Sequence, residues 1–437
     1  MGKVKVYISP DAMTAAASVM AMGSDTLPCS REEILNILSG EGVFFGIDVA
    51  AVDTHSAAPL GTRVVVANGI PRKPGSDASI RYKIRLSKRA PVETADGKVD
   101  FKELDLVKNV RRGQVLAEKI PLSLGEAGKD VKARESPPKK VSDVELPAGK
   151  NTTVTPDGMK LVAMIDGHVE IERGKIHVLD TFHHNTAVDM RSGNIHCNGG
   201  VEIRGAVKDG FQVTAEKDIH ILGQVEGGVV ASNQGEIRID QGVQGHIKGR
   251  LSARKNISAK FLENVLVEAG GDVLVRETIV HARIRAQGKI KTLEKPGILL
   301  GGEIYSERGI ECIDVGNETA AKTVLFLGPW RLQEIENRLV ELNEILKDLA
   351  AREASGAQDS NLLARRDAAN AEKTQLETEQ AAIMKRIGGE PPTLRVEGTM
   401  HPGVIVRAYP DHEFSPREAK RRFKLTATPK GFKAGAL

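Results

Sequence analysis

The chain contains few aromatic residues, few cysteines and no large surplus of charge of one sign. Aromatic side chains make up 3% of the 437 residues, whereas glycine occurs 44 times. This balance suits tightly turned β-structure better than a large aromatic catalytic cleft. The 62 Lys and Arg against 58 Asp and Glu leave a net charge of +4, too small to attract polyanions by itself. Cys29, Cys197 and Cys312 form no CxxC pair and no disulfide framework, which favours a reducing cytoplasm.

Long hydrophobic runs are also missing. No apolar segment approaches the ~20 residues that span a bilayer, so we expect no integral membrane segment. The Ala/Met-rich stretch 12–22 follows Lys3 and Lys5, an order that also occurs in signal peptides. However, Pro10 and Asp11 precede this stretch and favour the start of a helix there. We therefore expect a cytoplasmic protein.

Two regions precede the most regular part of the sequence. Residues 1–87 read as an N-terminal α+β domain, in which Ser30 and Glu33 have the spacing of a helix capping box. Residues 88–180 read as a β-rich connecting domain punctuated by glycine. Within it, residues 168–178 predict a β-hairpin that turns at Arg173-Gly174.

A period of six residues dominates the segment 193–315. Nine aliphatic positions follow one another at this interval: Ile195, Val201, Val207, Val213, Ile219, Val225, Ala231, Ile237 and Val243. A longer interval is superimposed on it, with steps of 18, 18, 20, 16, 17 and 20 residues. This longer repeat runs through Val201, Ile219, Ile237, Ile257, Val273, Ile290 and Ile310.

Six residues make one short strand and a corner, and three such sides close a triangular coil. Coils that stack at the ~4.8 Å strand spacing form a rod with one continuous core. We therefore predict a β-solenoid over residues 181–328, although the spacing does not give its handedness. Its predicted core residues are Ile195, Val201, Val207, Val213, Ile219, Val225, Ile237 and Val243.

The composition changes after Pro329. Apolar residues now step by 3 and 4, which predicts one seam of a coiled-coil hairpin over residues 329–388. The seam residues are Leu332, Ile335, Leu339, Leu342, Leu346 and Leu349. The second helix has a weaker seam, because Arg366, Lys373 and Gln380 occupy its companion positions. Residues 389–437 then read as C-terminal strands with a basic tail.

This basic tail contains five Lys and Arg between residues 417 and 424 and only one neighbouring aromatic residue, Phe423. Such a tract favours a solvated surface over one that binds anionic lipid or nucleic acid. We expect no nucleic-acid partner.

No catalytic, cofactor-binding or metal-binding residues are expected. His183, His184, His196 and Cys197 lack the convergent spacing of zinc ligands. The six-residue period leaves two other functions open. One is a hexapeptide-repeat acyltransferase that uses His220, His246 or His281. The other is a polymer-forming solenoid similar to bactofilins, which domains at both ends of the solenoid would block.

Several segments resemble the flagellar assembly protein A family. They are Gly42–Asp48, Ala67 and Gly69, Pro74, Gly75 and Asp77, Val99–Leu104, Gly113–Ala117, Gly125, Gly128, Asp130 and Val131, Gly167–Ile171, Gly193–Ile195, Asp209–Phe211, Val225–Gly227, Ala259–Asn264 and His401–Ile405. The sequence departs from the family pattern at Ala133, where glycine is usual, and at Glu216 and Asn256.

This resemblance covers roughly residues 1–425. It implies a bacterial protein with an N-terminal α+β region, a right-handed parallel β-helix and an inserted antiparallel coiled coil, and an association with flagellar assembly without a known reaction. The function that we expect is therefore a non-enzymatic cytoplasmic scaffold. Its expected partners are proteins of flagellar or polar assembly, and an exposed hairpin seam would alternatively pair two copies into a homodimer.

Overall fold

The computed structural model describes residues 3–20, 29–56, 59, 61–84, 92–93, 99–100, 102–246, 248–292, 294–354, 360–387, 391–428 and 430–437. Two compact units make up the chain. The first contains residues 1–84, 115–148 and 153–162, and the second contains residues 85–114, 149–152 and 163–437. The segment 88–180, which the sequence suggests is one domain, is thus divided between the two units.

The first unit consists of small sheets and two helices. Its elements are β1 (Lys3–Ile8), β2 (Thr14–Met20), α1 (Arg31–Gly40), α2 (Val49–Ser56), β3 (Arg63–Asn68), β4 (Ser79–Tyr82), β8 (Val115–Ile120), β9 (Gly128–Lys129), β10 (Glu135–Ser136), β11 (Thr152–Val154) and β12 (Lys160–Ala163). The sheets have the orders β1-β2-β3, β11-β12-β8-β4 and β10-β9. The predicted capping box begins α1, because Ser30 accepts from the backbone of Glu33 and Glu33 accepts from that of Ser30.

The helix expected after Asp11 is wrong, because residues 14–20 form the central strand β2. Ser9 and Asp11 instead close a tight turn in which Ser9 Oγ accepts from the backbone N–H of Thr14. β2 then pairs antiparallel with β1 on one side and β3 on the other. Its alternating residues Ala15, Ala17 and Val19 are buried, so a strand with two partners outweighs the helix propensity of alanine.

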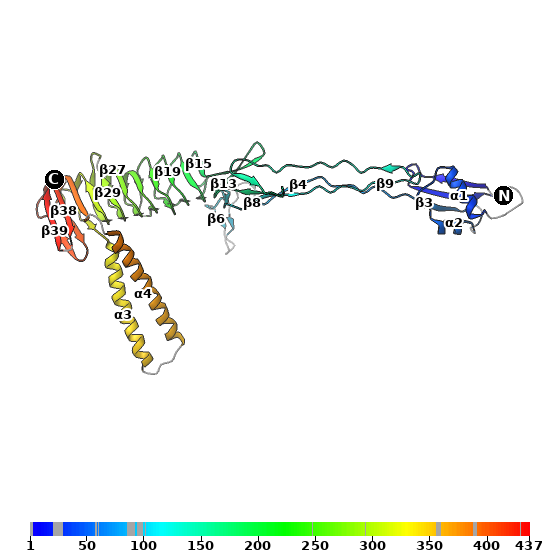
Figure 1. Ribbon diagram of the computed structural model, residues 1–437. Coiled ribbons are helices and arrows are strands. Elements are labelled where there is room, and N and C mark those ends of the chain that lie inside the picture. The colour runs from blue at the N-terminus through cyan, green and yellow to red at the C-terminus, as the bar shows by residue number, and fades with distance from the viewer. Residues whose placement is uncertain are drawn as a thin grey trace. The chain divides into compact units, whose positions relative to one another are not determined.

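The second unit begins with short strands and continues into the solenoid. The short strands are β5 (Val92–Glu93), β6 (Val99–Asp100), β7 (Asn109–Val110), β13 (Gly167–Glu172) and β14 (Lys175–Leu179). β13 and β14 form the predicted hairpin, and both Arg173 and Gly174 at its turn have positive φ. Figure 1 shows the solenoid coils following β13 and β15.

The solenoid has three sides, and the chain visits them in a fixed order within each coil. The first side contains β15 (Thr181–His184), β17 (Gly200–Ile203), β19 (Ile219–Ile221), β22 (Ile237–Ile239), β25 (Ile257–Glu263), β27 (Val273–Val280), β29 (Lys289–Thr292), β32 (Gly309–Cys312) and β35 (Thr393–Met400). The second side contains β20 (Val225–Glu226), β23 (Val243–Gln244), β30 (Ile298–Leu300), β33 (Asp314–Val315) and the C-terminal halves of β25 and β27. The third side contains β16 (Ile195–Cys197), β18 (Gln212–Ala215), β21 (Val229–Ser232), β24 (Arg250–Ala253), β26 (Leu266–Ala269), β28 (Arg283–Ala286), β31 (Gly302–Ser306), β34 (Thr323–Leu327), β36 (Val404–Ala408) and β37 (His412–Phe414).

Neighbouring coils pair in parallel, and equivalent inward residues stack on one another. On the first side the stack runs through Val201, Ile219, Ile237, Ile257, Val273, Ile290, Ile310 and Leu394. These residues are at most 1% exposed. Six of the steps in this stack are the sequence intervals noted above. The core residues Ile195, Val207, Val213, Val225 and Val243 are fully buried on the other two sides.

The six-residue spacing predicts that Ala231 faces the core. This prediction is wrong, because Ala231 faces outward on β21. Its neighbour Val230 is fully buried and pairs with Val213 of the coil before it. The connection between Val225 and β21 is a short turn at Gly227 and Gly228, so the inward position comes one residue earlier than a strict period of six requires.

Each coil needs a left-handed backbone residue where the second side turns into the third. Seven successive coils have positive φ there, at Gly210, Gly227, His246, Asn264, His281, Gly301 and Gly316. Glycine, asparagine and histidine adopt this conformation more readily than most residues. The turn geometry therefore accounts for residue types that would otherwise suggest chemistry.

Antiparallel strands close the C-terminal end of the solenoid. β37 pairs with β36 on the third side, and β38 (Lys420–Thr428) pairs with β35 on the first. β39 (Gly431–Ala436) then pairs with β38, so the residues after 391 continue the solenoid and cover its last coil. Figure 1 shows β38 and β39 at that end.

Candidate interaction surface

The helical hairpin is inserted between two stacked coils without breaking the stack. It consists of α3 (Trp330–Ala354) and α4 (Ser360–Ile387) and follows β34. β35 resumes on the far side of the insertion and pairs directly with β32, so Leu394 stacks on Ile310. The two ends of the insertion also meet, because a Cβ on Gly328 would lie 3.6 Å from Cγ of Pro392. The solenoid therefore continues as if the hairpin were absent.

The hairpin buries its own seam. Leu332, Ile335 and Leu342 are each 1% exposed, and Leu349 is also buried. Ala369, Leu376 and Ile383 of α4 pack against this row, with Leu339 and Leu346 half-buried beside it. This seam is therefore not free for the pairing of two copies that the sequence leaves open. A homodimer as such stays a prediction.

Polar contacts between the helices repeat along the hairpin. Arg331 Nε lies 3.0 Å from Glu379, and Arg338 Nε lies 2.8 Å from Glu372, one heptad further along each helix. A hydrogen bond from Arg338 holds the pKa of Glu372 below its ordinary value. At the companion positions of α4, Arg366 pairs with Glu353 and Lys373 Nζ donates to Asn343. These contacts fix the register where apolar packing is thin.

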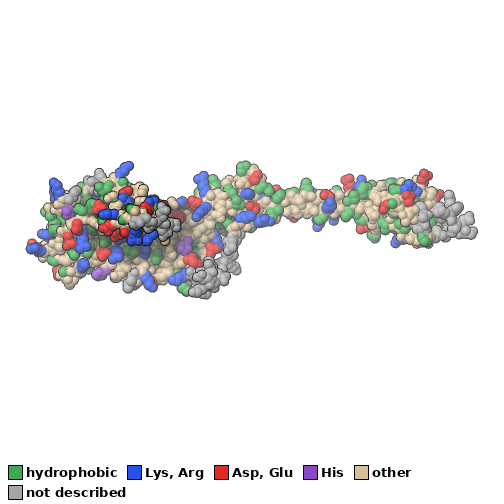
Figure 2. Space-filling model, turned by 90° about the horizontal axis from the view of Figure 1, so that it is seen from below, with side chains coloured by type: hydrophobic (Ala, Val, Ile, Leu, Met, Phe, Trp, Pro, Cys, Tyr) green, Lys and Arg blue, Asp and Glu red, His purple; other side chains and the backbone are tan. Residues whose placement is uncertain are grey.

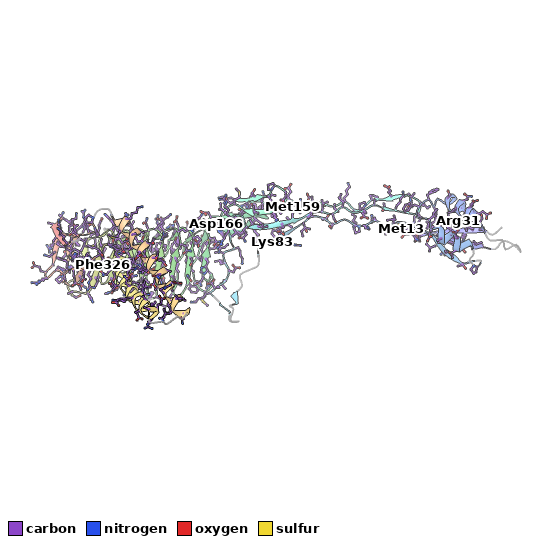
Figure 3. The ribbon with its side chains drawn as sticks, turned by 60° about the horizontal axis from the view of Figure 1, so that its bottom comes forward. Met13, Arg31, Lys83, Met159, Asp166 and Phe326 are labelled. Atoms are coloured by element: carbon purple, nitrogen blue, oxygen red, sulfur yellow. The ribbon has the colours of Figure 1, made fainter. Side chains whose placement is uncertain are left out.

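Aromatic side chains attach the hairpin to the solenoid. The ring of Trp330, the only tryptophan of the chain, lies 6.0 Å from that of Tyr305 on β31, which stacks on Phe326 at 5.7 Å. Phe326, labelled in Figure 3, lies on the solenoid beside the start of the hairpin. From the other side Tyr409 packs on the hairpin core, and its hydroxyl donates to Glu336. That hydrogen bond raises the pKa of Tyr409 to about 12.

A groove of about 500 Å³ runs between the first turns of α3 and the corner of four preceding coils. Its walls include Asn233, Arg254, Gln287, Trp330 and Glu334. Arg285 Nη2 lies 3.7 Å from Glu334 across it. The groove therefore has a mixed polar lining, with one aromatic wall at the base of the hairpin.

The outer surface of the hairpin is polar. Figure 2, in which the hairpin points toward the viewer, shows Lys and Arg interspersed with Asp and Glu over it. Among the described residues of the hairpin, the exposed large hydrophobic ones are Val340, Ile345, Leu363 and Met384. The sequence singled out neither Trp330 nor Tyr409, and the only signal near them was the change of composition at Pro329.

The histidines considered for acyl transfer do not converge. His220 lies on β19 of the first side, where its Nε2 is 3.0 Å from Asp240. Partial burial opposes ionisation of Asp240, but hydrogen bonds from Arg238 and His220 hold its pKa below the ordinary value. His246 and His281 occupy left-handed turn positions, and the ring of His281 fills the space beside Gly301 of the next coil. The structure thus gives each of them a local role in the coils.

Residues considered as metal ligands are also engaged separately. His183 faces Glu202, His184 bonds the backbone of Ala187, and His196 bonds Glu103. Cys197 is buried in the core. No group of three or more potential ligands occurs in the part of the chain that the structure describes.

Both ends of the solenoid carry additional chain. Asn109 bonds the backbone of His196 and Asn198 at the first coil of the third side, and Val107 joins the core there. At the other end β37 to β39 pair antiparallel, as described above. Parallel stacking of one solenoid directly on another would have to displace these segments.

Two family models match the chain. One, described as the Flagellar Assembly Protein A beta solenoid domain, matches residues 180–425, and the other, described as the Flagellar Assembly Protein A N-terminal region, matches residues 4–174. No match was found among the curated proteins or the solved structures. Among the described residues, no helix is both long and apolar enough to cross a membrane.

Proposed function

Because the chain belongs to the flagellar assembly protein A family, we propose that it acts in flagellar assembly as a non-enzymatic cytoplasmic scaffold. In this role the solenoid is a rigid body, and the helical hairpin is the element that docks a partner protein. The observation that carries this proposal is the insertion of the hairpin between stacked coils, with Leu394 resting on Ile310.

The geometry of the hairpin supports this role. Its seam is filled internally and its base is attached through Trp330 and Tyr409, so its outer faces are not needed to fill the solenoid core. Charged helical faces with scattered apolar residues suit a partner that binds by specific polar pairing rather than by burying one large patch. Such an element adds recognition to a scaffold at little risk to its stability.

The proposal is tested by deleting residues 331–387. This deletion joins Trp330 to Gly388-Gly389-Glu390, and the proximity of Gly328 and Pro392 means that the coils need not shift. The shortened protein should keep cooperative unfolding and the far-ultraviolet signature of β-structure. In cells it should accumulate normally but fail to support flagellar assembly, and it should lose a partner that the full-length protein captures.

Two results would contradict the proposal in different ways. If the deletion unfolds the protein, the hairpin is part of the folding core. If the folded deletion variant still supports flagellar assembly and captures the same partners, docking occurs elsewhere. The variant Leu274→Asp, which changes an exposed residue of the solenoid, is a control outside the hairpin and should keep both flagellar assembly and partner capture.

A further inference from the structure

The net positive charge of the chain is concentrated at its C-terminal end. Residues 391–437 contain nine Lys and Arg against four Asp and Glu, a surplus of five, whereas the whole chain has 62 against 58. The remaining residues are therefore balanced to within one charge. Most of these C-terminal residues belong to β35–β39, which end the solenoid.

Several cations on the solenoid body are paired with carboxylates of a neighbouring coil. Lys208 lies 2.8 Å from Glu226, Arg250 lies 2.7 Å from Glu268, and Arg283 lies 3.0 Å from Glu303, in each case with the next coil. A carboxylate on the adjacent strand thus neutralises each of these cations. A surface of this kind has little attraction for a large anion.

The outward face of β38 and β39 differs. Arg421, Lys424 and Lys433 are exposed there and have no ion-pair partner among the described residues. Lys424 lies beside Arg395 of β35, and Lys433 lies across from Thr426. Glu397 of β35 is 3.1 Å from Arg395, and no carboxylate of the described residues lies within ion-pair distance of the other three cations. The composition of the tract alone favours a solvated surface, but the clustering of unpaired cations on one strand face points to a ligand. We propose that this face, defined here as the basic cap, docks on a membrane surface that carries anionic phospholipid headgroups.

The chemistry of the basic cap favours a membrane over a protein partner. Protein interfaces are anchored by aromatic and large aliphatic side chains in well-packed pockets. In the described part of residues 391–437 no large hydrophobic side chain is exposed. On the same face Gly435, which has no side chain, pairs with Lys424 and lets a flat surface approach closely. Mobile lipid headgroups can match such a face without complementary shape.

Single-stranded nucleic acid fits the basic cap less well, because its binding relies on exposed aromatic rings that stack on bases. Phe423 points into the core at 8% exposure, and Phe432 packs against Phe414. The basic cap therefore offers positive charge but no exposed aromatic ring on which a base could stack.

The test is sedimentation of the full-length protein with vesicles. Vesicles of phosphatidylcholine with 30% phosphatidylglycerol should bind the protein, and pure phosphatidylcholine vesicles should not. Each Lys or Arg near such a surface strengthens binding by roughly fivefold, so R421Q/K424Q/K433Q should weaken it by roughly a hundredfold. High salt should abolish binding by the wild type.

A charge-matched control variant distinguishes vesicle binding by the basic cap from binding that depends only on the net charge of the protein. Arg204, Lys248 and Lys255 are exposed on the solenoid body and have no ion-pair partner among the described residues. R204Q/K248Q/K255Q should bind vesicles as the wild type does. The 331–387 deletion should also bind them, and this result separates the proposal from hairpin docking. The proposal would be overturned if both triple variants lost vesicle binding equally, or if the wild type did not bind anionic vesicles. Tighter binding to a short duplex DNA than to the vesicles would also overturn it. Unchanged thermal unfolding of each variant excludes misfolding as the cause.

Discussion

The solenoid and the hairpin are stabilised in opposite ways. In the solenoid the inward residues stack on their equivalents in neighbouring coils, and the three stacks merge into one core that extends from Val188 to Ala408. The hairpin buries one narrow row between two helices and alternates it with ion pairs such as that of Arg338 with Glu372. The contacts with the solenoid that the structure describes lie at its base, at Trp330, Glu334 and Glu336.

This contrast separates stability from recognition. Coils that support one another form a body whose stability is shared over many contacts, as in other repeat proteins. A hairpin that packs mainly on itself can open without opening that body. The four predictions below test this separation, from the largest expected effect to the smallest.

The largest effect is expected in the solenoid core. Val273 is fully buried, and Val273→Asp would place an unpaired carboxylate in the stack between Ile257 and Ile290. The cost should be about 3–5 kcal/mol or more, and thermal or urea unfolding should show loss of the native state. The next residue, Leu274, is 41% exposed on the same strand, and Leu274→Asp is the matched control that should unfold like the wild type. Equal destabilisation by both variants would refute the inward and outward assignment.

A core change in the hairpin should act locally. Leu342 is 1% exposed, so Leu342→Ala should destabilise the hairpin by roughly 2–4 kcal/mol. Proteolysis within α3 and α4 should become faster, while the main unfolding transition of the solenoid stays in place. Val340→Ala, at a position 59% exposed, should change neither. A drop of the main transition with Leu342→Ala would show that hairpin and solenoid unfold as one unit.

A smaller effect is expected at the corner between the third and first sides. Asn256 Oδ1 accepts from the backbone N–H of Asp272 in the next coil, at 2.9 Å, and Asp218 and Asp272 make the same contact in other coils. Asn256→Ala should therefore cost about 1 kcal/mol in urea unfolding. Asn256→Asp keeps the acceptor and should be nearly neutral. Equal loss in the two variants would mean that the hydrogen bond is not what the side chain supplies.

The smallest effect is expected from an ion pair on the hairpin surface. The pKa of Glu372 is held below its ordinary value of 4.5 by Arg338, so its contribution is present above about pH 4.5 and is lost as the pH falls through the lowered value. Glu372→Gln should weaken the hairpin slightly at pH 7 and reduce the loss between pH 7 and acid. Helicity measured by circular dichroism against pH checks this. An unchanged pH profile would show that the pair contributes nothing.

Much of the architecture could be predicted from spacing alone. The repeat from Val201 to Ile310 coincides with a stack of paired strands, and the heptad steps place α3 at residues 330–354. Both patterns are local consequences of a strand period of two and a helical period near 3.6. The right-handed sense that the family resemblance implies stays a prediction.

Other features depend on contacts that the sequence does not encode locally. The strand at residues 14–20 forms because two partner strands flank it, and Val230 replaces Ala231 because one turn is shorter. Two departures from the family pattern also gain an explanation, since Asn256 and Glu216 both bond the next coil. Ala133 has a φ of 64°, the left-handed conformation that glycine adopts most easily.

Native-state hydrogen exchange of the intact protein tests most directly whether the hairpin is an appendage of a self-sufficient solenoid. The amides of α3 and α4 should exchange through an opening that leaves those of β22 to β29 protected, and Leu342→Ala should accelerate only the hairpin amides. Identical exchange free energies in hairpin and solenoid, with both accelerated alike by Leu342→Ala, would contradict the account.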